Sequence, residues 1–289
     1  MSDYRLAVLA DIHGNLPAFE AVLADLKDFA PLDRILVAGD TTTGPRQETI
    51  FNRLREMDAV FIQGNSEQWL CALDDGTIEE YYVKAKQFAL GRWAYANLSR
   101  EALGFMHTLP EQTVYHLPGT SPIRITHGSP RKINEGVYPN ANPAQLDGIL
   151  ADIVEPVILF GHTHQPWQVQ TDGRLALNPG AVCSPLNGQV GAQYALLDWD
   201  GERWQAHLRC VPYDLDLIRR DFIESGLMDS TILARGYLGG ILTGRDATSA
   251  FITYAKNLAR AAGFGDLPYI PNEVWDQAGA TFAWENWPV

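Results

Sequence analysis

The first third of the chain alternates between short apolar runs and segments in which apolar residues recur at helical spacing. The run YRLAVLAD ends at Asp11 and is continuously apolar, as in a strand that is buried on both faces. Residues 16–26 follow Asn15 with helical spacing, which predicts a helix capped by that asparagine. The same pattern recurs in RILVAGD, in a helix around residues 48–57, and in AVFIQGN. This order predicts a parallel sheet built from β-loop-α units.

The remainder of the chain divides into a helical stretch, a β-rich region and a helical end. Residues 67–109 have a mainly helical pattern, whereas residues 113–211 contain seven candidate strands separated by turn residues: TVYHL, IRIT, PVILFG, QVQT, RLALN, YALLDWD and RWQAHLRCV. After Pro212 the helical pattern returns and ends in an aromatic tail. We therefore expect one domain at residues 1–212 and a helical C-terminal extension at residues 213–289, packed on the core.

Composition and charge narrow the class of protein. The chain has 289 residues, 46% of them hydrophobic and 20% charged, which is typical of a globular protein with a sizeable core. Its formal net charge of -13 disfavours long nucleic acids and anionic membranes as partners. No apolar stretch reaches the roughly 20 residues that span a bilayer, and the N-terminus lacks the features of a signal peptide. We expect a cytoplasmic protein.

The three cysteines, Cys71, Cys183 and Cys210, are far apart and show no CxxC spacing. An odd number of widely separated cysteines is typical of free thiols in a reducing compartment. We interpret all three as buried structural residues.

Polar residues stand at the ends of the predicted strands, where ligands bind in parallel α/β sheets. Asp11 and His13 follow the first strand in ADIHGN, Asp40 follows the second, and Asn65 follows the third. Taken singly, each of them is more often a turn or capping residue. An aspartate and a histidine one residue apart nevertheless suit Mn, Fe, Zn or Ni.

Histidines follow two later strands in the same way. His162 and His164 in GHTHQP come directly after an apolar strand, and His127 follows IRIT. Two imidazoles at a buried strand end are costly unless something binds them. The remaining histidines have no polar company and are interpreted as structural: His107, His116 and His207.

Five polar clusters at five strand ends together supply two carboxylates, an amide oxygen and four imidazoles. Such a set can hold two divalent ions roughly 3.5 to 4 Å apart if one carboxylate bridges them. We expect that carboxylate to be Asp40. The candidate ligands are Asp11, His13, Asp40, Asn65, His127, His162 and His164.

The order D-x-H, G-D, G-N, H-G and G-H-x-H resembles the calcineurin-like metallophosphoesterases, especially their small bacterial and archaeal phosphodiesterase-type branch. The resemblance spans about Leu6 to Pro212 and includes LSREALGFMHTLP, HGSP, NPGAVCSP and YALLDWDG. It implies an α/β fold, a four-layer α/β/β/α sandwich, here with the C-terminal helical extension. It also implies one metal on Asp11, His13, Asp40 and His164, and a second metal on Asp40, Asn65, His127 and His162.

The resemblance implies hydrolysis of a phosphate ester by in-line attack of a water or hydroxide that bridges the metals. On this basis the catalytic residues are Asp40, Asn65, His127 and His162, and manganese is the expected activating metal.

This sequence departs from many relatives at Ser66, where those that cleave monoesters carry a histidine able to protonate the leaving oxygen. Serine cannot do so at neutral pH, which favours small phosphodiesters or nucleotide anhydrides as substrates. Ser66, Arg46 and Arg131 are candidate substrate-binding residues, although each arginine is more simply interpreted as a solvated surface residue.

Other functions remain open at this stage. A phosphomonoesterase or protein phosphatase is disfavoured by Ser66, and a diadenosine polyphosphate hydrolase is not excluded. A metal-binding scaffold is an alternative of another class, but it would not need all seven ligands. The expected partner is a small phosphate-containing substrate, and the C-terminal extension is a candidate surface for a homo-oligomer.

Overall fold

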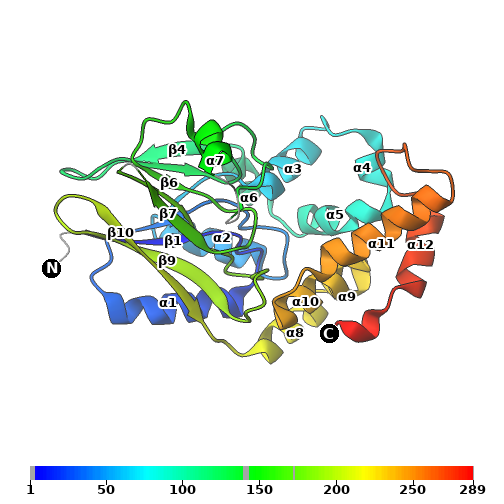
Figure 1. Ribbon diagram of the computed structural model, residues 1–289. Coiled ribbons are helices and arrows are strands. Elements are labelled where there is room, and N and C mark those ends of the chain that lie inside the picture. The colour runs from blue at the N-terminus through cyan, green and yellow to red at the C-terminus, as the bar shows by residue number, and fades with distance from the viewer. Residues whose placement is uncertain (1–3, 139–142, 172, 289) are drawn as a thin grey trace.

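Two five-stranded sheets lie face to face in the protein (Figure 1). The computed structural model describes residues 4–138, 143–171 and 173–288. The first sheet has the strand order β10-β9-β1-β2-β3, and the second has the order β4-β5-β6-β8-β7. Buried apolar residues of both sheets, among them Leu6, Ile125 and Leu197, form the core between them.

The first sheet confirms the parallel β-loop-α pattern predicted from the sequence. Strand β1 (Tyr4–Leu9) is parallel to β2 (Arg34–Val37), which is parallel to β3 (Val60–Phe61). Strands β9 (Ala192–Trp199) and β10 (Trp204–Val211) extend the other side in antiparallel fashion. Successive side chains of a strand point to opposite faces of the sheet. Those of β1 enter the apolar cores on both sides, so both faces of this strand are buried.

The second sheet contains the remaining strands expected between residues 113 and 211. Its strands are β4 (Gln112–Tyr115), β5 (Ile123–Thr126), β6 (Val157–Leu159), β7 (Trp167–Thr171) and β8 (Arg174–Asn178). The central strands β5, β6 and β8 are parallel, so their carboxyl ends lie at the same edge.

Helices cover both outer faces and complete the four-layer α/β/β/α sandwich. The first sheet is covered by helices that include α1 (Leu16–Leu26), α2 (Gln47–Glu56), α3 (Asn65–Asp74) and α6 (Arg100–Met106), with η1 (Lys27–Phe29) after α1. The predicted cap of α1 is present, because the Asn15 side chain accepts a hydrogen bond from Ala18 N at 3.1 Å. The second sheet is covered by α7 (Pro143–Leu150), which the sequence analysis did not predict.

A helical region lies beside the sandwich and is formed by two separate segments (Figure 1). The earlier segment contains α4 (Glu80–Lys84), η2 (Lys86–Phe88) and α5 (Ala89–Ala96). The later one contains α8 (Leu215–Glu224), α9 (Leu227–Ser230), α10 (Leu233–Thr243), α11 (Ala247–Ala261), α12 (Asn272–Thr281) and η3 (Trp284–Asn286). Leu90 of α5 packs against both apolar clusters of the C-terminal helices.

The C-terminal helices confirm the helical pattern after Pro212 but divide it more finely than expected. Within this pattern the segment LDLIRRDFIESGLM breaks at Gly226, whose φ of 73° lies in the left-handed region. Among the described residues, no helix is long and apolar enough to cross a membrane.

Two of the three cysteines are buried as predicted, but Cys210 is exposed. The prediction was wrong for Cys210 because β10 is an edge strand of the first sheet with several exposed positions. The three histidines interpreted as structural, His107, His116 and His207, are all on the surface.

Candidate metal centre

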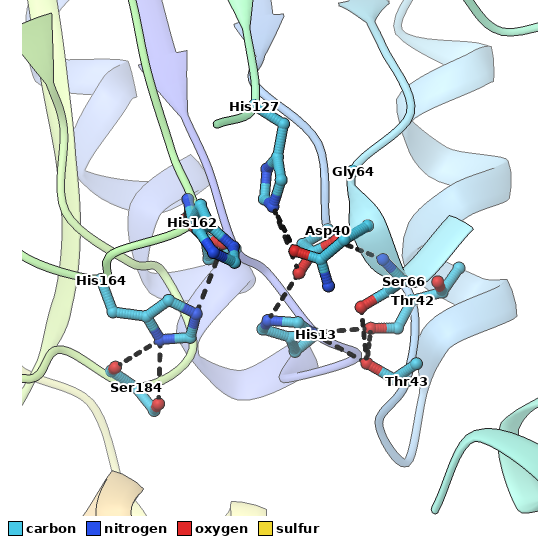
Figure 2. A network of polar contacts seen from close by, with 12 residues as sticks. His13, Asp40, Thr42, Thr43, Gly64, Ser66, His127, His162, His164 and Ser184 are labelled. Carbon is cyan, nitrogen blue, oxygen red and sulfur yellow. Dashed lines mark hydrogen bonds and ion pairs between the residues drawn. The ribbon is translucent and has the colours of Figure 1, made fainter. Parts of the chain in front are cut away.

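The loops that follow β1, β2, β3, β5 and β6 converge at one edge of the two sheets. They bring together all seven candidate ligands, several of which Figure 2 shows around Asp40. By distance alone, donor atoms within 4.8 Å of one another form two groups: Asp11 with His13 and His164, and Asp11 with Asp40 and His127. The carboxyl ends of parallel strands therefore meet as expected.

The backbone of this edge is unusually constrained. Seven residues other than glycine have a positive φ in the described chain, and six of them lie here: Asp11, His13, Asp40, Thr43, His162 and His164. Such conformations cost of order 1 to 3 kcal/mol each and persist where surrounding bonds enforce them. Two such bonds join the loops directly, since His13 N donates to Asp40 O at 3.0 Å and Asp11 N donates to Gly39 O at 3.1 Å. Clustered strain of this kind is characteristic of functional sites.

Three histidines are oriented by backbone carbonyl groups. The Nδ1 atoms lie 2.9 Å from Thr42 O in His13, 2.8 Å from Ala38 O in His127 and 2.8 Å from Ser184 O in His164. A carbonyl oxygen only accepts, so each Nδ1 must carry the proton. The opposite atom, Nε2, is then the ring nitrogen that faces the centre, and it can bind a metal ion once it has no proton, which is the arrangement typical of metal-binding histidines.

These Nε2 atoms face carboxylates at distances longer than a hydrogen bond. Asp40 Oδ2 lies 3.5 Å from Nε2 of His13 and 3.5 Å from Nε2 of His127. Asp11 Oδ1 lies 3.4 Å from Nε2 of His164. Figure 2 shows His13 and His127 approaching Asp40 from opposite sides. Asp40 Oδ2 thus faces two histidines, and Asp11 belongs to both groups of donor atoms.

Comparison with known proteins decides the family. Residues 4–202 match the model of the calcineurin-like phosphoesterase superfamily domain. The chain belongs to this superfamily. Membership implies a phosphoester hydrolase that depends on divalent metals, and the donor set above fits such ions.

Proteins of bacteria and archaea resemble this superfamily member over most of its length. A crystal structure of a metallophosphoesterase from Sphaerobacter thermophilus is 26% identical, with a TM-score of 0.65, and covers 83% of this chain and 99% of its own. A hypothetical protein from Pyrococcus horikoshii OT3 has 20% identity and a TM-score of 0.68 over 83% of this chain and 98% of its own. An uncharacterized protein of Methanocaldococcus jannaschii is 25% identical over 77% of this chain and 93% of its own length.

The electrostatics of the phosphoesterase centre couple carboxylates to imidazoles. Burial alone would raise the pKa of Asp40, but His127 and His13 lower it below its ordinary value. Burial alone would lower the pKa of His127, but Asp40 and Asp11 raise it to about 10. His127 Nε2 also lies 3.0 Å from Asn65 Oδ1, so both of its ring nitrogens face oxygen atoms. The carboxylates of Asp40 and Asp11 therefore favour a positive charge beside them.

His162 is placed differently from the other three histidines. Its backbone N donates to the Asp11 carboxylate at 3.0 Å, and its ring packs edge-on against His127 with centroids 5.2 Å apart. Burial and the neighbouring His127 lower its pKa. The side chain is half-buried and lines the cavity described below.

A buried glutamate that the sequence analysis missed fastens two of the ligand loops. Glu67 Oε2 accepts hydrogen bonds from Asp40 N at 2.9 Å and Gly64 N at 2.8 Å, and its Oε1 accepts from Thr42 N at 2.9 Å and Thr42 Oγ1 at 2.6 Å. A glutamate three residues into a helix, bonded to the preceding backbone, is half of a capping box. The spacing of three residues between Gly64 and Glu67 is visible in the sequence and could have identified Glu67.

The segment NPGAVCSP, which the resemblance included without a role, supports the remaining loops. Cys183 N donates to Asp11 O at 3.0 Å, and Asn178 Nδ2 donates to Gly161 O at 2.7 Å. Ser184 supplies the carbonyl oxygen that orients His164. The segment NPGAVCSP therefore holds the loops of two candidate metal ligands, Asp11 and His164, in place.

A cavity of about 1040 Å³ opens onto the centre. His13, Asp40, Asn65 and Ser66 form part of its wall, and aromatic residues of the helical segment form another: Trp69, Tyr82 and Phe88. The C-terminal helices contribute further lining residues, including Tyr237 and Arg245. Neither was predicted from the sequence. Tyr237 lies in α10, whose helical spacing indicates packing, and Arg245 lies in the short connection between α10 and α11 and belongs to no motif.

The candidate substrate-binding residues have different positions. Ser66 lines the cavity, and its backbone N donates to Asp40 Oδ1 at 2.8 Å. Arg46 instead pairs with Asp221 at 2.6 Å and Glu224 at 3.0 Å on α8, and Arg131 pairs with Glu135 at 2.5 Å. Neither arginine is among the described residues that line the cavity. The carboxylates of α8 hold the guanidinium group of Arg46, and Glu135 holds that of Arg131. We therefore assign no substrate contact to them.

Proposed function

We propose that the protein is a dinuclear metal-dependent phosphoesterase that acts on small phosphodiesters or nucleotide anhydrides. The observation that carries this proposal is the position of Asp40 Oδ2, 3.5 Å from Nε2 of both His13 and His127. One carboxylate oxygen between two imidazole nitrogens is the arrangement expected for a ligand shared by two cations.

The chain supplies a donor set suited to two transition-metal ions. One ion would be held by Asp11, His13, Asp40 and His164, and the other by Asp40, Asn65, His127 and His162. Imidazole with carboxylate oxygen suits Mn, Fe, Zn or Ni, and we expect Mn to support activity. The chemistry that two such cations supply is neutralisation of the phosphate charge and a lowered pKa for a water molecule.

The contribution of the protein is orientation. The carbonyl groups bonded to Nδ1 of His13, His127 and His164 hold the imidazole rings in one tautomer, and the N–H of Ser66 fixes the second oxygen of Asp40. Of the predicted catalytic residues, Asp40 and His127 are buried, whereas Asn65 and His162 are half-buried and reach the cavity. The latter two can therefore contact a bound phosphate directly.

The surroundings of the centre support a small diester or anhydride. Ser66 stands where a leaving-group acid would be needed for poor leaving groups such as serine. The cavity volume of about 1040 Å³ matches a ligand considerably larger than phosphate. Its aromatic wall of Trp69, Tyr82 and Phe88 offers apolar contact to a second group on the phosphorus.

We also propose that residues 1–212 carry the metal ligands and that residues 213–289 close the cavity. The match to the superfamily over residues 4–202 and the C-terminal residues in the cavity wall support this division of roles. Self-association through residues 213–289 stays a prediction, which sedimentation velocity of the full chain tests.

Substrate class is tested by comparing kcat/KM for bis-p-nitrophenyl phosphate with that for a phosphoserine peptide, using protein reconstituted with Mn²⁺. We expect faster hydrolysis of the diester, loss of activity after chelation and recovery on addition of Mn²⁺. Faster cleavage of the phosphopeptide would overturn the diester preference. Less than one metal ion per chain, not restored by Mn²⁺, would favour a scaffold over an enzyme.

A further inference from the structure

Tyr237 of α10 reaches the metal centre from the C-terminal helices. Its ring packs edge-on against His13, with centroids 5.6 Å apart and an interplanar angle of 84°. It lines the same cavity as His13, Asp40 and Asn65. An aromatic residue of the C-terminal helices is therefore in contact with a candidate metal ligand.

Other hydroxyl side chains line the cavity together with Tyr237. Thr43 and Ser66 are two of them. Thr43 Oγ1 lies 3.4 Å from Ser66 Oγ and 2.9 Å from His13 Nδ1. Tyr237, Thr43 and Ser66 thus bring three hydroxyl side chains to the wall of this cavity.

We propose that the hydroxyl of Tyr237 donates a hydrogen bond to a phosphoryl oxygen of the bound substrate, so that the C-terminal helices supply a substrate-binding group of the active centre. This inference rests on the proposed function, because it needs a phosphate group at the metals. It assigns a chemical role to a segment in which the sequence shows no motif.

The charges around the cavity explain why a hydroxyl donor matters there. Of the described residues lining the cavity, Arg245 alone carries a permanent positive charge. Its Nη2 donates to Asn286 O at 3.0 Å, and its guanidinium stacks over Trp287 at 4.4 Å. Phosphoryl oxygens that face away from the metals therefore need neutral donors. Oriented donors in a site with little water stabilise developing charge on oxygen.

A purely structural role makes different predictions. If the hydroxyl only fastened α10 to the loop at Thr43, its removal would lower thermal stability without changing phosphate affinity. If it acted through His13, its removal would change the metal content. Tyr237→Phe separates these cases because phenylalanine keeps the edge-on contact with His13 and removes only the hydroxyl.

The test compares wild type, Tyr237→Phe and Tyr254→Phe, each reconstituted with Mn²⁺. Tyr254 is a matched control, since its hydroxyl contacts Thr281 at 2.9 Å on the C-terminal helices and does not line the cavity. Calorimetric titration with inorganic phosphate measures binding, and turnover of bis-p-nitrophenyl phosphate measures activity. Metal content and melting temperature are recorded for all three proteins.

We expect Tyr237→Phe to bind phosphate about tenfold or more weakly, as for loss of a hydrogen bond to a charged group, with unchanged metal content. Tyr254→Phe should match wild type. Equal phosphate affinity in Tyr237→Phe and wild type, or loss of Mn²⁺ from the variant, would overturn the inference. Absence of turnover in wild type would instead overturn the proposed function, which phosphate affinity does not measure.

Discussion

Glu67 illustrates how much of the centre depends on residues that touch no substrate. Its buried carboxylate accepts four hydrogen bonds from the backbone and side chain of the loops that carry Asp40 and Gly64. Residues that orient metal ligands in this way commonly change metal affinity ten- to a hundredfold when they are replaced.

Replacing Glu67 by glutamine should weaken both folding and metal binding. In either orientation of the amide, its NH₂ group faces backbone N–H donors that the carboxylate now satisfies. We expect the free energy of unfolding to fall by about 1 to 3 kcal/mol. We also expect Mn²⁺ affinity to fall about tenfold or more.

Thermal unfolding and Mn²⁺ titration measure the two effects. Glu48→Gln is the matched control, because the half-buried Glu48 side chain accepts one bond, from Ser99 N at 3.0 Å. A Glu67→Gln variant with the stability and Mn²⁺ affinity of wild type would contradict the buttressing role.

At the scale of elements, the strand-to-helix turns hold the ligands through close backbone approach. Gly64 precedes α3, and a Cβ atom there would lie 2.1 Å from Asp40 Oδ1 and 2.4 Å from Asp40 N. No rotamer change relieves a contact with backbone nitrogen. The turn after β3 can therefore only be made by glycine while Asp40 keeps its position.

Gly64→Ala should displace Asp40 and abolish tight metal binding. Gly104→Ala on α6 is the control, because nothing lies within 4 Å of a Cβ atom there and alanine favours a helix by roughly 0.5 to 1 kcal/mol. We expect the metal content after Mn²⁺ reconstitution to fall in the first variant and to match wild type in the second. Full metal occupancy in Gly64→Ala would show that the turn tolerates a side chain.

The elements also show what the sequence could predict. Apolar runs that end in Asp11, Asp40 or His127 mark both a buried strand and the polar residue beyond it, so strand ends and ligands were predicted together. Helix α7 was missed because a helix of 8 residues has few periodic positions. The contact of Tyr237 with His13 joins distant parts of the chain, and no local spacing encodes such a contact.

At the scale of the molecule, the cavity lies between the sandwich and the helical region. Its wall combines the ligand loops, the segment around α3 to α5, and helices α10 and α11. The protein has a formal net charge of -13, so an anionic substrate has to be attracted by a local positive charge. A metal centre would supply that charge. Two bound ions that share Asp40 are therefore the central expectation for this protein.

Electron paramagnetic resonance of the protein loaded with Mn²⁺, together with its metal content, tests this directly. The account predicts two ions per chain with an exchange-coupled signal in wild type. In Asp40→Asn it predicts loss of the coupling and of phosphoesterase activity, with folding checked by circular dichroism. A single uncoupled Mn²⁺ per chain in wild type, or coupling and turnover retained in Asp40→Asn, would contradict it.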